Sequence, residues 1–323
     1  PRGAPCAALT IIRSMTERQF PTQMSWFWAM LMGSGMLGGG ILALIIAATR
    51  VVLPYDEQFV GMTRKQLTAV NSRLLAFMAH DRVSLAGTMI GVGVFYVQLS
   101  VFGIRAGYAW ARQAVLISAF AGFASFFLFL GFGYFDPFHA FVTAILFPFL
   151  LLTLYGNIGR SNTSYTADKT YVKKPSVVAK VGQWLLVAHG VALCSAGVII
   201  SSVGCTTVFV PEDLKFMHTT AEVITTANPR LLPLVAHDRA TFGGMLLSSG
   251  IAMAWSAWRG YGPGRPWLWV MYLAAGLPAY LCAIGVHVVV GYHDWWHLTP
   301  AIAGCTIWGL GVLFSHRYLC ERK

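Results

Sequence analysis

Two stretches of the sequence decide the fold: LLAFMAHDRVSLAG at residues 74–87 and LLPLVAHDRATFGG at residues 231–244. When the chain is shifted by 157 residues, 54–82 aligns with 211–239 without a gap, and 13 of the 29 aligned positions are identical. A self-match of this length is the signature of an internal repeat. The sequence therefore predicts two related halves, each with an Ala-His-Asp-Arg block beside an apolar run.

The composition is that of a membrane protein. Hydrophobic residues make up 56% of the 323 positions and charged residues only 11%, whereas about 25% of a typical soluble domain is charged. A helix needs about 20 apolar residues to cross a bilayer. Eight stretches of about this length predict eight spans: 25–49, 83–104, 112–133, 138–156, 182–204, 240–258, 266–290 and 298–315. The lipid bilayer is thus the first expected partner.

The number of spans in each half sets the predicted orientation of the halves. Because four is even, both halves enter the membrane from the same side, as in a parallel repeat about an axis along the membrane normal. The predicted fold class is all-α, a polytopic membrane protein with about eight transmembrane helices in two parallel four-helix repeats. The matching motifs should then lie at one depth.

The same reading divides the chain into segments. The long connections at 52–81 and 209–238 should form interfacial helices on the extracytoplasmic side, with Thr63 and Thr220 as N-caps. The predicted segments are a cytoplasmic N-terminal segment at 1–24, a first repeat at 25–156, a cytoplasmic linker at 157–181, a second repeat at 182–315 and a cytoplasmic tail at 316–323.

The formal charge of +11 reflects orientation in the membrane and does not indicate nucleic-acid binding. Basic residues gather in the segments that eight crossings place on one side, and the positive-inside rule makes this side cytoplasmic. They are Arg2, Arg13, Arg18, Arg105, Arg112, Arg160, Lys169, Lys173, Lys174, Lys180, Arg259, Arg265, Arg317, Arg322 and Lys323. Nine of the twelve acidic residues fall on the other side. Both termini are therefore predicted to be cytoplasmic, in a bacterial inner membrane.

The two Ala-His-Asp-Arg blocks supply the candidate catalytic residues: His80, Asp81 and Arg82, and His237, Asp238 and Arg239. Three interpretations are open. The aspartate could cap the following span while the arginine pairs with it and reaches lipid headgroups. Alternatively, a carboxylate beside an imidazole could orient a metal ligand. Finally, the arginine could bind an anionic headgroup or substrate.

A second repeated motif supplies candidate cofactor-binding residues. With one inserted residue, GYFDPFH from position 133 aligns with GYHDWWH from position 291, which places an aspartate and a histidine one turn apart in each half. The candidates are Asp136 and His139 in the first half, and His287, His293, Asp294 and His297 in the second. Together with His237, His293 and His297 could bind a transition metal or ligate haem. The alternative is a hydrogen-bonded histidine girdle among Tyr292, Trp295 and Trp296 at the membrane interface.

One further histidine, His189, falls inside a predicted span, where the first half has Met32. Intramembrane ionisable residues are functional candidates. A buried neutral imidazole bonded to a carbonyl is nevertheless the favoured interpretation.

The segments VVLPYDEQFVGMT, LLAFMAHDRVSLAGTM and NPRLLPLVAHDRATFGG resemble those of a group of bacterial multi-pass membrane proteins, some of which carry the label of dihydroorotate dehydrogenase. A flavin-dependent dehydrogenase of that class is a barrel of alternating strands and helices, and the eight apolar stretches do not supply one. The resemblance implies quinone-linked redox partners.

Three functional hypotheses follow. The leading one is a subunit or enzyme of a membrane redox system that binds a metal, haem or quinone at an extracytoplasmic His/Asp/Arg cluster. The second is a transporter of a small anion or lipid, for which Pro148 and Pro278 are the candidate helix breaks. The third is a structural subunit of a larger membrane complex. The sequence has no Walker, HExxH, CxxCH or GxSxG motif, which disfavours those chemistries.

Overall fold

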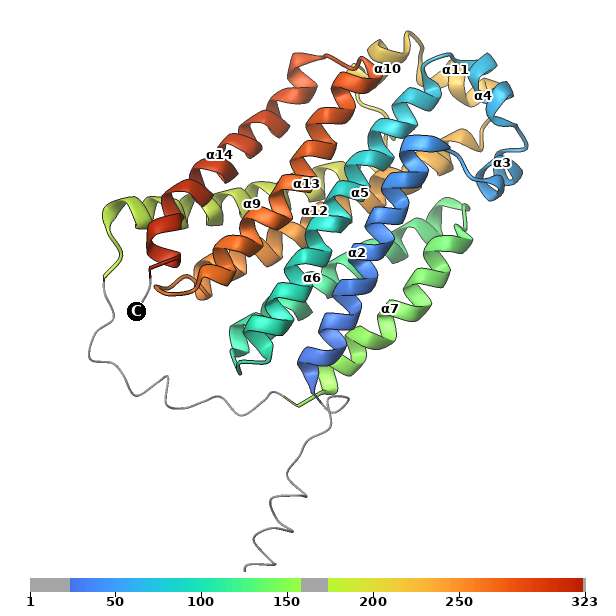
Figure 1. Cartoon of the computed structure of the whole chain (residues 1–323). Helices are drawn as coiled ribbons and strands as arrows, with labels where there is room; N and C mark the ends of the chain where they lie inside the picture. Colours follow the sequence, from blue (N-terminus) through green and yellow to red (C-terminus); the bar gives the residue numbers. More distant parts are fainter. Residues whose placement is uncertain (1–23, 158–173, 322–323) are drawn as a thin grey trace, which may run out of the picture.

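The computed structural model describes residues 24–157 and 174–321, and these parts of the chain are helical apart from turns and one isolated bridge. Eight long helices run side by side, and four short ones gather at one end of the bundle (Figure 1). The long helices are α2 (Ser25–Thr49), α5 (Leu74–Gln98, continued by the π-helical turn Leu99–Ile104), α6 (Ala109–Leu128), α7 (Pro137–Tyr155), α9 (Val177–Cys205), α12 (Leu231–Arg259), α13 (Pro266–Val290) and α14 (Trp295–Leu319).

Seven of the long helices are apolar enough to span a membrane, and α12 is the one that is not among them. Most residues of α12 are buried inside the bundle, including Thr241, Ser248, Ser249 and Ser256. A helix surrounded by protein does not need an apolar surface toward lipid, so small and polar residues lower its hydropathy. An integral membrane protein is thus supported, and the eighth span at 240–258 stays a prediction.

The short helices form a cap over the bundle end. They are α3 (Pro54–Val60), α4 (Arg64–Val70), α10 (Pro211–Met217) and α11 (Ala221–Ala227). Thr63 and Thr220 accept hydrogen bonds from Gln66 and Val223 amides, which confirms both as N-caps. A cluster of buried apolar side chains from both segments fills the space between the cap and the long helices.

Contacts within the cap occur in pairs whose members lie 157 residues apart. The Asn71 amide donates to the Met217 carbonyl at 2.8 Å, and the Asn228 amide donates to the Val60 carbonyl at 2.7 Å. A second such pair joins Arg73 to the Phe216 carbonyl and Arg230 to the Phe59 carbonyl. Val51 and Val208, also 157 residues apart, both have a φ of 64°. Such a value is a strained one for a β-branched residue.

The predicted starts of the second and sixth spans, at 83 and 240, are wrong as helix boundaries. Helices α5 and α12 both begin nine residues earlier, at Leu74 and Leu231. The Asn71 and Asn228 side chains accept the amide hydrogen two residues on, at 2.8 and 2.9 Å. Asparagine turns of this kind reverse the chain and allow a helix to start. The Ala-His-Asp-Arg blocks therefore lie two turns inside their helices.

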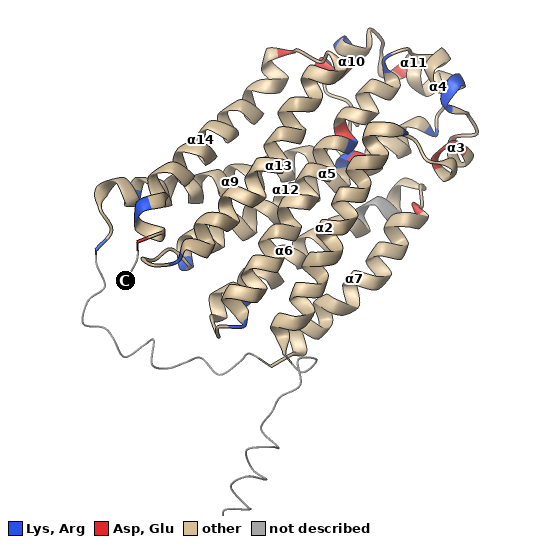
Figure 2. Ribbon diagram, viewed as in Figure 1, with Lys and Arg blue, Asp and Glu red and all other residues tan. Residues whose placement is uncertain are grey.

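Charged residues follow the same architecture (Figure 2). Within the described residues, basic side chains lie both in the cap and at the ends of the long helices away from it, whereas the acidic ones, apart from Glu321, lie in or near the cap. A separate group of both signs lies inside the bundle at α5, where Figure 2 shows red and blue together. The predicted basic residues Arg2, Arg13, Arg18, Arg160, Lys169, Lys173, Arg322 and Lys323 lie outside the described residues.

Candidate metal centres

Two groups of side chains could each hold a metal ion, and both lie near the cap. The first, which we call the three-histidine cluster, consists of His80, His287 and His297. The second, the aspartate–histidine cluster, consists of Asp136, His139 and His237. In each group one ligand atom per residue lies within 4.8 Å of the others. Each cluster joins the histidine of one Ala-His-Asp-Arg block to residues of the other half of the chain.

Hydrogen bonds fix the imidazole orientations in the three-histidine cluster. Nδ1 of His80 lies 3.1 Å from an Asp81 oxygen, and Nδ1 of His287 lies 2.5 Å from the Ala283 carbonyl. A carboxylate and a carbonyl can only accept, so both Nδ1 atoms carry the hydrogen. The two Nε2 atoms then present lone pairs, and they face each other at 3.1 Å. Two facing lone pairs repel unless a proton or a metal cation lies between them.

The aspartate–histidine cluster is built in the same way. Nδ1 of His237 lies 3.2 Å from Asp238, which directs Nε2 toward Nδ1 of His139 at 2.8 Å. One oxygen of Asp136 lies 3.2 Å from the same His139 nitrogen and 3.9 Å from His237 Nε2. Its other oxygen caps α7 by accepting the amides of Phe138 and His139.

The distances between ligand atoms suit a transition metal. With bonds of about 2.1 Å, neighbouring ligands lie roughly 3.4 Å apart in a tetrahedral site and roughly 3.0 Å apart in an octahedral one. The ligand pairs described above are separated by 2.8 to 3.9 Å. Only small side-chain adjustments would therefore be needed in the aspartate–histidine cluster and for His80 and His287, while the ligand atom of His297 lies within 4.8 Å of theirs.

Two arginines, the half-buried Arg82 and the buried Arg239, pair with the aspartates that lie behind the histidines. Arg82 pairs with Asp238 and Asp56, both at 2.8 Å. In the matching arrangement, Arg239 pairs with Asp81 at 3.1 Å and with Asp213 at 2.7 Å. Each arginine thus joins the aspartate behind the histidine of one half to a cap aspartate of the other.

The charges in this region favour a cation. Five carboxylates (Asp56, Asp81, Asp136, Asp213 and Asp238) and two guanidinium groups make a sum of −3 when all are ionised. Burial raises the pKa of Asp213 despite the neighbouring Arg239. Excess negative charge in a buried site is costly unless it is compensated. Metal cations in the two clusters would supply that compensation.

Two tyrosines complete the surroundings of the clusters. The Tyr134 hydroxyl donates to Asp56 and that of Tyr292 donates to Asp213. Burial, together with the adjacent carboxylate, raises the pKa of each tyrosine, so both stay protonated donors. The ring of Tyr134 meets His237 edge-on at 5.1 Å between centroids, and that of Tyr292 stacks on His297 at 4.5 Å.

The predicted trio of metal ligands, His237, His293 and His297, is divided in the structure. His237 belongs to one cluster and His297 to the other, while His293 is exposed and belongs to neither. Asp294, which matches Asp136 in the other half, caps α14 and pairs with Lys215 at 3.3 Å. His287 takes the third ligand position in that half.

Several alternative interpretations are corrected. Asp81 and Asp238 do not cap their helices, because both lie well inside them. The arginines that follow are buried in ion pairs and so do not reach headgroups. In the proposed girdle, Trp295 and Trp296 are exposed but Tyr292 is buried. His189 is buried as expected, yet its partner at 2.5 Å is the Tyr280 hydroxyl and not a carbonyl.

Sequence reasoning missed four residues of this site. Asp56 and Asp213 pair with the two arginines, and Tyr134 and Tyr292 donate hydrogen bonds to these two carboxylates. All four are shared between the halves when the chain is aligned with itself, so the repeat contained the signal.

Comparisons with protein-family models, curated proteins and solved structures give no match to this chain. The assignment of the site therefore depends on its geometry.

Proposed function

We propose that this protein is a membrane metalloprotein of a redox system that holds two transition-metal ions, one in each cluster. The observation that carries the proposal is the pair of Nε2 lone pairs of His80 and His287 that face each other at 3.1 Å. In each ring, Nδ1 donates its hydrogen to an acceptor, which is Asp81 for His80 and the Ala283 carbonyl for His287. A carboxylate or carbonyl that accepts from a histidine in this way commonly orients it as a metal ligand.

The ligand sets indicate the class of metal. Three protein ligands leave coordination positions open for water or substrate, as in catalytic sites. Three imidazoles suit zinc or copper, whereas two imidazoles and a carboxylate are typical of non-haem iron(II). Haem between His80 and His287 is disfavoured, since two axial imidazoles need roughly 4 Å between nitrogens at about 2.0 Å per bond.

The proposal includes two parallel repeats of four spans, with the clusters on the extracytoplasmic side. The paired contacts with an offset of 157 residues support the repeat. The excess of basic over acidic residues at the end away from the cap supports the orientation. A transporter with broken helices is less well supported, because α7 and α13 continue through Pro148 and Pro278. A purely structural subunit would keep the ion pairs without binding metal.

Metal analysis of the purified full chain tests the proposal. After stripping with a chelator, the protein is offered iron(II), zinc, copper(I) or manganese and analysed by mass spectrometry for bound metal. We expect two equivalents in the parent chain and one in either His80→Ala or His139→Ala. The exposed His293→Ala is the matched control and should keep both. A folded parent chain that retains no stoichiometric metal would refute the proposal and favour the structural role.

A further inference from the structure

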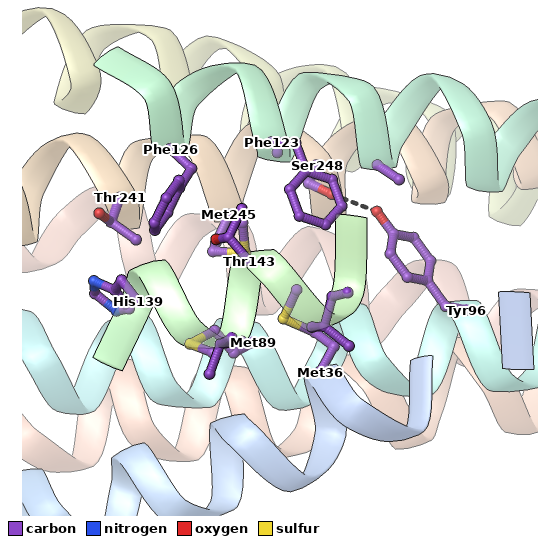
Figure 3. Close-up of a pocket in the computed structure, with 14 residues that line it drawn as sticks. Met36, Met89, Tyr96, Phe123, Phe126, His139, Thr143, Thr241, Met245 and Ser248 are labelled. Atoms are coloured by element: carbon purple, nitrogen blue, oxygen red, sulfur yellow. Dashed lines mark hydrogen bonds between the residues drawn. The ribbon is translucent and has the colours of Figure 1, made fainter. Parts of the chain in front are cut away.

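His139 lines two cavities, and they differ in character. The first, about 60 Å³, runs between α2, α5, α6, α7 and α12 from His139 to the hydrogen-bonded pair Tyr96 and Ser248 (Figure 3). Its walls are mainly apolar, with Met36, Met89 and Met245 among them. Methionine side chains adapt readily to flexible apolar ligands.

The dimensions of this cavity suit a chain better than a ring system. The lining residues of α6, α7 and α12 span 119–126, 139–146 and 241–248. Seven residues at 1.5 Å rise make roughly 10 Å. A volume of about 60 Å³ holds only about four to six water-sized groups. The cavity is therefore a narrow slot about two helical turns long.

One wall of the slot, between α6 and α7, reaches the surface of the bundle. Phe126 on α6 and Val142 and Thr143 on α7 line it and are only half-buried. Beside them, the apolar side chains of Phe141 and Ile145 are 64% and 44% exposed, as expected for a surface against lipid. A hydrocarbon chain could thus enter between α6 and α7 from the bilayer.

The second cavity, also about 60 Å³, lies on the cap side of His139 and is more polar. Its lining includes Tyr55, Arg82, Asp136 and Asp238. The arginine is already paired with two carboxylates, so the cavity offers no unpaired positive charge to an anionic head. A neutral head with a hydroxyl or carbonyl oxygen fits these residues better.

We propose that the two cavities together bind a single-chain amphiphile with a neutral oxygen-bearing head, its chain in the apolar slot and its head beside His139. This proposal rests on the proposed function only for the metal that the head would meet at the aspartate–histidine cluster. Medium-chain alcohols and methyl ketones share this chemistry.

The test uses the full chain in lipid nanodiscs and two radiolabelled probes whose length matches the slot, octanol and 2-octanone. Gly122→Leu should weaken binding of the accepted probe roughly tenfold, because a larger side chain there meets Met245 and Ser248 and fills the slot. Gly309→Leu is the matched control, since an added side chain at Gly309 meets nothing within 4 Å. Thr143→Trp in the wall between α6 and α7 is a second variant that leaves the slot interior intact.

The outcomes separate this inference from the metal proposal. Saturable binding of either probe that is lost in both slot variants, with metal content unchanged, supports both. The same binding in a chain without metal supports the slot and refutes the metalloprotein. Normal metal content with no saturable binding of either probe, or with binding insensitive to both variants, overturns the inference.

Discussion

The sharpest prediction concerns the carboxylate behind His80. Asp81→Asn keeps the size and one acceptor oxygen of the side chain that lies 3.1 Å from His80 Nδ1, but removes its charge. Loss of such a carboxylate typically lowers metal affinity by about 10- to 100-fold. At about 1.4 kcal/mol per tenfold change, this is about 1.4 to 2.8 kcal/mol of binding free energy at the three-histidine cluster.

The same change also weakens the fold, so the two effects must be measured separately. Arg239 loses one buried partner but keeps Asp213 at 2.7 Å. Breaking a buried ion pair costs about 3 to 5 kcal/mol, and the remaining partner should hold the loss to the lower end. Thermal unfolding of the metal-free protein in detergent measures this part.

Metal affinity is best measured in a His139→Ala background, where only the three-histidine cluster binds. Zinc is titrated in competition with a chromogenic chelator, and Glu57→Gln serves as the control because that half-buried carboxylate lies in α3, outside both clusters. Equal affinities for the Asp81→Asn and Glu57→Gln chains would show that Asp81 does not support a metal ligand.

Three further predictions concern stability and use thermal unfolding as the measurement. Gly40→Ala should destabilise the protein by about 1 to 3 kcal/mol, because the added methyl group would lie 2.8 Å from the Ile90 amide nitrogen. Gly38→Ala, where the added methyl group meets nothing within 4 Å, should stabilise it by about 0.5 to 1 kcal/mol. Equal effects of the two substitutions would contradict this packing. Tyr280→Phe removes the hydroxyl that pairs with Nε2 of the buried His189 and should cost about 1 to 3 kcal/mol; an unchanged midpoint would contradict it. Arg82→Met strands two buried carboxylates and should cost about 3 to 5 kcal/mol, so a variant as stable as the parent chain would refute the ion-pair geometry.

The helical architecture could be predicted because apolar length is a local property of the sequence. The boundaries of α2, α13 and α14 lie within a few residues of the predicted spans. The starts of α5 and α12 could not be read in this way. Their charged residues are compensated by partners about 157 residues away, and a window of 20 residues sees only the uncompensated charge.

The residue types of the candidate site could also be predicted, but their grouping could not. His80, His237 and His139 stand out because the repeat contains them twice or matches them. Which histidines meet depends on the packing of one half against the other, and this leaves no local pattern in the sequence. His287 has no histidine counterpart in the first half, so the repeat could not identify it as a third ligand.

The exchange of ligands between the halves has a consequence for biogenesis. When the ribosome has made only the first half, Asp136 and His139 are already present. His237, which completes their cluster, is synthesised about 100 residues later. The same holds for His80, whose two companions come from the last two long helices. Under the proposed function, neither cluster could bind its metal during translation of the first half, and metal loading would be a late event that reports complete insertion of the polypeptide.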